Sequence, residues 1–384
     1  MAHKLLGTCL LLTSSILLGS TAVQAEDWKD TLKNMGQLYS SDDGFVQEVK
    51  VFGRVHYQAN YSDGEVAGES FNHDRDEIRR LRAGGSVKFL DGFRVLGRWN
   101  AREILDDDVV LYDTWDELYI DYTKKDVLGF DKASIGYGRY KLLFGGEEHQ
   151  SSKRIKTIER SAINNRFGSR RPTGVNVNLE KNGIEYTAGI WSTEFEREKW
   201  AGWSEDVAYQ LGMIAPVADG ELILDFVYAD TEDQILTPFN YDWAASLSYT
   251  RQFGAVNVLT NVTFSDVDSR IFTGNDPYGF VVLPSFFILE DKLEAVLRYQ
   301  YAGTDSDLGV PRSSGSRGLR RAALEEVTRT GNGDEYQAVY AGLNYYVAGD
   351  NLKFMTGVEY EDIGSNLNTE LDGVTLWAAV RAYF

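Results

Sequence analysis

The most constraining feature of the sequence is a two-residue alternation of apolar and polar side chains that persists for about ten residues at a time. Val49, Val51, Val55 and Tyr57 alternate with charged or amide-bearing residues, and the segments 78–89 and 92–102 repeat the pattern. A β-strand places successive side chains on opposite faces, so each segment predicts a strand with one apolar and one polar face. Strands of ~9–11 residues suit a tilted membrane crossing better than a soluble sheet, whose strands average ~5–6 residues.

The spacing of these segments separates a membrane barrel from a soluble β-sandwich. We expect sixteen strands, at residues 47–61, 78–89, 92–102, 114–122, 132–141, 173–180, 183–192, 205–215, 220–229, 241–250, 254–265, 278–288, 291–301, 335–347, 351–361 and 373–384. Long connections alternate with short ones along the whole chain. Short periplasmic turns and long outer loops are typical of outer-membrane barrels. The sequence therefore predicts an all-β fold, a 16-stranded antiparallel transmembrane β-barrel in a Gram-negative outer membrane.

The N-terminal region does not alternate. Lys4, an apolar run over residues 5–18, and small residues at Val23 and Ala25 predict a signal peptide over residues 1–25. Residues 26–45 are expected to form a short periplasmic lead-in segment, with Trp28 and Leu32 at helical spacing, and residues 46–384 the barrel. At the other end, alternation leads to Phe384, like the terminal aromatic signal of outer-membrane proteins.

Composition excludes several other functions. The formal charge of −19 argues against a nucleic-acid partner, which requires a basic face. The one cysteine and four histidines disfavour a disulfide framework or a metal enzyme, so we expect no cofactor, no metal and no enzymatic activity. A lipid hydrolase on a barrel is the alternative, and His149 with Ser151 is the pair of residues that would suit it.

A sixteen-stranded barrel encloses an aqueous channel, so the expected function is passive diffusion of small hydrophilic solutes. Residues 142–172 form a 31-residue connection, and between Glu147 and Arg171 it holds seven basic and three acidic residues. This connection is the candidate constriction. Its candidate site residues are Lys153, Arg154, Lys156, Arg160 and Arg166.

The predicted inward faces of the first three strands are also basic. The candidate pore-wall residues are Lys50, Arg54, Arg80, Arg82, Arg94, Arg98 and Arg102. Charges that line a narrow, low-dielectric pore are screened less than charges in outer loops. We therefore predict a moderate anion preference despite the acidic total, with a cation-preferring general porin as the alternative.

Several motifs resemble one family of bacterial porins. They are Gly138-Arg139-Tyr140-Lys141-Leu142-Leu143-Phe144-Gly145, then Glu147-Glu148, Ser151-Ser152 and Glu159-Arg160-Ser161, with 76–82 and 342–346 as further matching stretches. Together they are similar to the phosphate-selective porin O and P family. The resemblance implies a homotrimer, a third loop that folds into the barrel, and small anions as permeants, with phosphate or polyphosphate as candidates. We expect the barrel to lie in outer-membrane lipid and lipopolysaccharide.

Overall fold

The computed structural model describes residues 27–101, 112–168, 170–193, 206–230, 239, 241–266, 276–305, 317–329, 331, 333–365 and 369–384. The chain divides into two units, residues 1–35 and 36–384. In the first unit, helix α2 (Asp27–Asn34) covers the beginning of the predicted lead-in segment. The predicted signal peptide over residues 1–25 lies outside the described residues. Among the described residues, no helix is both long enough and apolar enough to cross a membrane.

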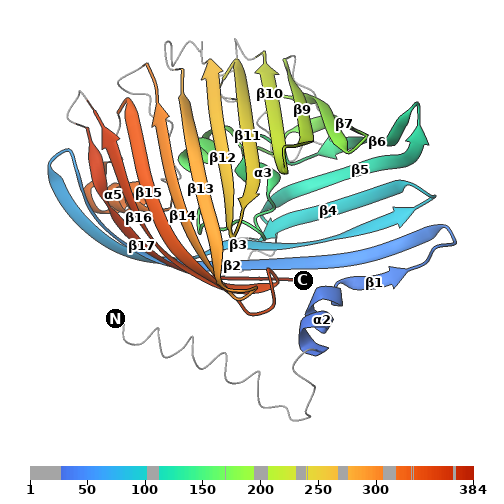
Figure 1. Cartoon of the computed structure of the whole chain (residues 1–384), viewed down its shortest axis with the longest axis horizontal. Helices are drawn as coiled ribbons and strands as arrows, with labels where there is room; N and C mark the ends of the chain where they lie inside the picture. Colours follow the sequence, from blue (N-terminus) through green and yellow to red (C-terminus); the bar gives the residue numbers. More distant parts are fainter. Residues whose placement is uncertain are drawn as a thin grey trace. The chain divides into compact units, whose positions relative to one another are not determined.

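The second unit is a closed antiparallel barrel of sixteen strands (Figure 1). The strands are β2 (Val46–Val66), β3 (Glu69–Phe89), β4 (Phe93–Ala101), β5 (Thr114–Val127), β6 (Phe130–Arg139), β7 (Thr173–Lys181), β8 (Ile184–Ser192), β9 (Val207–Val217), β10 (Gly220–Ala229), β11 (Trp243–Phe253), β12 (Val256–Asp266), β13 (Tyr278–Leu289), β14 (Leu293–Gly303), β15 (Glu335–Tyr346), β16 (Leu352–Gly364) and β17 (Leu371–Tyr383). Strand β17 pairs with β2 and closes the ring. A short strand β1 (Gln37–Ser40) pairs with the beginning of β2 outside the ring. The predicted sixteen-stranded barrel is confirmed.

Two connections differ from the sequence prediction. The segment 62–77, expected as a long loop, is the continuation of β2 and β3, which turn at Ala67 and Gly68. The segment 123–131 is likewise strand up to a tight turn at Leu128 and Gly129. Both segments carry many charged residues, which hid the alternation. Strand pairing continues beyond the membrane because both strand faces are polar there and can meet water.

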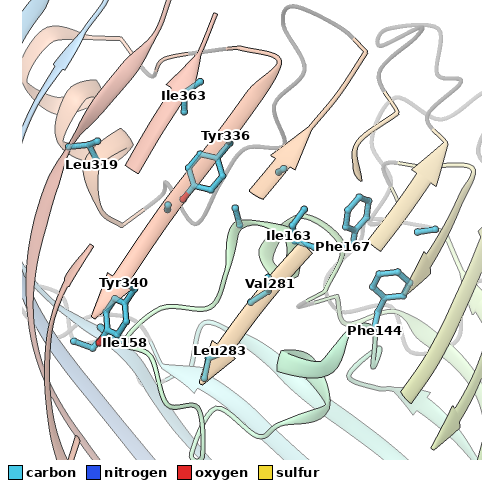
Figure 2. Close-up of a cluster of buried hydrophobic side chains, with 14 of the residues drawn as sticks. Phe144, Ile158, Ile163, Phe167, Val281, Leu283, Leu319, Tyr336, Tyr340 and Ile363 are labelled. Carbon is cyan, nitrogen blue, oxygen red and sulfur yellow. The ribbon is translucent and has the colours of Figure 1, made fainter. Parts of the chain in front are cut away.

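The connection 142–172 folds into the barrel, as the family resemblance implied, and we call it the inward loop. It carries the short helices α3 (Gly146–His149) and α4 (Ala162–Phe167). Its apolar side chains Phe144, Ile158, Ile163 and Phe167 are buried against the inner faces of strands from β11 to β16 (Figure 2). Full burial of side chains of this size contributes about 2 kcal/mol each. This contribution holds a polar loop inside a water-filled barrel.

Tyr340 on β15 is a buried inner-wall side chain that packs directly on glycines. Its side chain lies over Gly357 of the neighbouring strand β16, where an added Cβ would come within 2.6 Å of the hydroxyl oxygen and two ring atoms. Gly364 on the same strand has its nearest neighbour atom at 3.8 Å. The barrel therefore needs glycine at position 357, whereas position 364 has room for a larger residue.

We predict that Gly357→Ala destabilises the barrel by about 1–3 kcal/mol, because the methyl group displaces the buried Tyr340 ring. The matched variant Gly364→Ala should leave stability within about 0.5 kcal/mol of wild type. The measurement is the urea midpoint of unfolding in detergent micelles. Equal midpoints for the two variants would contradict the packing described here.

Candidate functional site

The inward loop is anchored by polar groups on the inner wall. The backbone N–H groups of Gly145 and Gly146 donate to Asp225 (2.9 Å) and Asn261 (2.7 Å). Arg298 donates to the carbonyl of Glu159 at 2.8 Å, and Lys353 donates to the carbonyl of Ile155 at 3.1 Å. Backbone groups of a buried loop must find partners, and here wall side chains supply them. The loop is fixed against one half of the wall, which leaves the lumen beside β2 to β6.

A cavity of about 470 Å³ lies between the inward loop and that part of the wall. Among the described residues, nine arginine and lysine side chains line it against two carboxylates. The cations are Arg54, Arg79, Arg80, Arg82, Arg98, Arg139, Lys141, Arg160 and Arg171, and the carboxylates are Asp116 and Glu117. We call this space the arginine cavity. It is the candidate functional site.

Asp116 holds three of the arginines of the cavity. Its carboxylate is 3 % exposed and accepts from Arg98 at 2.7 Å, Arg82 at 3.0 Å and Arg171 at 3.2 Å. Guanidinium groups placed this close together repel one another, so a shared buried carboxylate is needed to keep them in one place. Asp116 thus joins strands β3, β4 and β5 to the end of the inward loop.

Glu148 has the same role on the inward loop. It is fully buried and pairs with Lys141 at 3.1 Å, Arg160 at 3.2 Å and Arg171 at 3.8 Å. Burial favours the neutral carboxyl, but Arg160, Lys141 and Arg171 outweigh it and lower the pKa of Glu148 to about 2. Burial lowers the pKa of Lys141 to about 7, although Glu148 opposes this shift.

Two wall arginines of the cavity make no ion pair with any described residue. Arg54 donates to the Ser152 hydroxyl, and Arg80 has one guanidinium nitrogen that is buried without a partner. Lys153 lies 4.0 Å from the centre of the Tyr383 ring. Burial, and then the charges of Arg54, Arg98 and Arg154, lower the pKa of Lys153 to about 8. The uncompensated positive charge is therefore concentrated between β2, β3 and the tip of the inward loop.

Not all predicted site residues reach this cavity. Arg54, Arg80, Arg82, Arg98 and Arg160 line it. Lys153 and Arg154 lie at the loop tip beside it. Lys156 pairs with Glu294 at 3.0 Å, and Arg166 lies on α4 against Phe167. Lys50 pairs with Glu48 and Arg94 with Asp121, both away from the cavity, and Arg102 lies outside the described residues.

The sequence reasoning missed Arg79 and Asp116, and two β-bulges explain why. Across β2 and β3, His56 pairs with Arg80 but Tyr57 pairs with Ile78, so Arg79 is an extra residue. Across β4 and β5, Arg98 pairs with Glu117 but Trp99 pairs with Trp115, so Asp116 is extra. A bulge lets two consecutive side chains face the same side, whereas strict alternation assigns one of them outward.

The comparisons with known proteins agree with this architecture. The family model Phosphate-selective porin O and P matches residues 49–217. The outer membrane channel DcaP of Acinetobacter baumannii is 14 % identical with a TM-score of 0.56, over 90 % of this chain and 99 % of that one. OmpT of Vibrio cholerae is 11 % identical with a TM-score of 0.57, over 90 % of this chain and 100 % of that one. An anion-selective porin from Comamonas acidovorans is 9 % identical with a TM-score of 0.56, over 88 % of this chain and 99 % of that one. No curated protein matches the chain.

The closed barrel, the inward loop and the polar lumen define the class: this is an outer-membrane channel of Gram-negative bacteria. The family match confirms the predicted resemblance to the phosphate-selective porins O and P. His149 and Ser151, the pair considered for a hydrolase, lie on the inward loop, where the Nε2 atom of His149 is 3.0 Å from Asp225. The family and the fold favour a channel over an enzyme.

We predict that Asp116→Asn destabilises the barrel by about 3 kcal/mol, because three guanidinium groups lose their shared charge partner. Asp121→Asn is the matched control on the same strand, since Asp121 pairs with the more exposed Arg94. It should cost about 1 kcal/mol or less. Urea unfolding midpoints compare the two variants, and a smaller effect for Asp116→Asn than for the control would refute the assignment.

Proposed function

We propose that the channel carries small hydrophilic solutes by passive diffusion with a moderate preference for anions. The observation that carries the proposal is the ratio of charged groups at the arginine cavity, nine cations to two carboxylates. An anion that passes such a wall exchanges water for guanidinium donors. A cation meets the repulsion of side chains whose positive charge is uncompensated.

The local charge outweighs the net charge of −19 because of where each lies. Charges exposed to solvent are screened within about 8–10 Å at physiological salt. Charges in a narrow cavity with protein walls are screened much less and focus the potential on a passing ion. Arg54 and Arg80 are both in such a place.

Phosphate and related oxyanions are candidate permeants within this proposal. Arginine presents donors in a planar fork that matches oxyanions better than it matches halides. The description of the matching family and the anion-selective porin among the structural neighbours favour the same class of permeant. Most arginines of the cavity are already bonded to carboxylates, which supports moderate rather than strict selectivity.

The first functional prediction concerns the two arginines without an ion pair. Replacing both, as Arg54→Ser with Arg80→Ser, should lower the chloride-to-potassium permeability ratio about fivefold. Lys50→Ser is the control, because Lys50 is already paired with Glu48. The measurement is the zero-current potential of single channels across a KCl gradient. A cation preference in the wild type would end the proposal, and an equal effect of Lys50→Ser would end the assignment of these arginines.

The second prediction concerns pH. Lys153 is charged below its pKa of about 8 and neutral above it. Raising the pH from about 7.5 to about 9.5 should therefore weaken the anion preference, and this range lies above the pKa of Lys141, about 7. The same zero-current potential measures it. Lys153→Met should remove the pH effect and Lys153→Arg should keep the preference high throughout, so an unchanged pH effect in Lys153→Met would contradict the role of this lysine.

A further inference from the structure

A second connection also folds onto the inner wall. Helix α5 (Leu319–Val327) belongs to the long connection between β14 and β15 (Figure 1). This connection lies at the end of the barrel that we expect to face the outside of the cell. Its side chains Leu319, Ala322 and Ala323 are buried. Leu319 lies so close to the backbones of β2 and β17 that a Cβ at Gly64 or Gly373 would come within 2.8 Å of it. Helix α5 therefore lines the lumen on the strands that carry the arginine cavity, nearer to the outer mouth.

The exposed side of α5 is tied to β3 by ions. The Nδ1 atom of His73 is 2.6 Å from Glu326, and its Nε2 atom is 3.0 Å from Glu325. Arg75 also binds Glu325, at 2.7 Å, and so does Arg321 of α5 itself. We call the set His73, Arg75, Glu325 and Glu326 the mouth latch. The guanidinium groups of Arg75 and Arg321 stay charged, whereas the imidazole of His73 exists in a neutral and a protonated form.

The two contacts of His73 place different demands on a neutral and on a protonated ring. A neutral imidazole has one N–H donor, and the other nitrogen is an acceptor. Both ring nitrogens of His73 face carboxylates, which are acceptors at neutral pH, so both contacts are satisfied when the ring is protonated. When the ring loses one proton, one nitrogen lone pair points at a carboxylate oxygen and that contact becomes repulsive.

A hydrogen-bond chain extends from α5 toward the inward loop. Arg317, next to the start of α5, binds Glu77 of β3, which is 1 % exposed. Gln58 of β2 donates to Glu77 at 2.9 Å and also to Glu159 of the inward loop at 3.0 Å. The two inward-folded segments thus share one network through buried wall residues.

From these contacts we propose that the mouth latch is a pH-responsive set of ion pairs that holds α5 on the inner wall at the outer entrance. With His73 protonated, α5 is held on the wall. As pH rises through the range in which histidines lose their charge, between about 5 and 8, the mouth latch weakens and α5 departs from the wall more often. Each departure places α5 in the path of solutes above the arginine cavity.

Hydrogen–deuterium exchange of the full chain in detergent micelles tests the mouth latch directly. After correction for the intrinsic pH dependence of exchange, protection of the α5 amides should fall about threefold between about pH 6 and about pH 8, the size expected for partly exposed ion pairs. In His73→Gln, protection should be low and independent of pH. In His73→Lys, a permanent cation with several donors, it should be high at both values. Asp74→Asn, on the outward face beside His73, should behave as wild type.

Two results would overturn the proposal: protection in the wild type that does not change with pH, or the same change in His73→Gln. If His73→Gln does not fold, the comparison of wild type with His73→Lys still decides. Single-channel recordings then give the consequence, brief closures at about pH 8 that are rarer in His73→Lys. Exchange does not depend on ion preference, so a failure of the proposed anion selectivity leaves this test intact.

Discussion

Every backbone N–H and C=O group that lies in lipid must have a hydrogen-bond partner within the protein, and the rest of this structure depends on this requirement. In a bilayer an unpaired strand edge costs several kcal/mol per group, so a sheet that crosses it must close on itself. Here β17 pairs with β2 from Leu371 to Tyr383, and the ring has no open edge. Closure with sixteen strands encloses a space too wide for side chains to fill. The polar inward faces of the strands line this space, and the inward loop fills part of it.

Buried charges inside the lumen are arranged around a few carboxylates. Asp116 and Glu148 each hold several cations, and Arg171 contacts both, so the wall and the inward loop form one charged framework. Most of these cations therefore have a carboxylate partner, which offsets part of their cost of desolvation, although the cations outnumber the carboxylates. Arg54 and Arg80 have no such carboxylate partner among the described residues, and the proposed anion preference depends on them.

Much of this architecture could be predicted from the sequence because alternation is a local property with a direct structural meaning. The sixteen strands and the basic wall of β2 to β4 follow from it, as does the basic inward loop from its composition. The extended β2–β3 hairpin could not be predicted, since both of its faces are polar beyond the membrane and no period remains. The partner of Lys156 could not be predicted either, because Lys156 and Glu294 lie far apart in the sequence.

The β-bulges at Arg79 and Asp116 could not be predicted from the sequence, and they bring both residues to the candidate site. Strict alternation would direct one residue of each pair, Arg79-Arg80 and Asp116-Glu117, toward the lipid. A charged side chain at that face costs up to ~2–4 kcal/mol near the midplane. One extra residue in each strand turns both members inward, where Arg79 binds Glu159 of the inward loop at 2.6 Å and Asp116 gathers three arginines. The same local irregularity therefore keeps charge out of the lipid, fixes the inward loop to the wall, and concentrates arginine at one level of the channel.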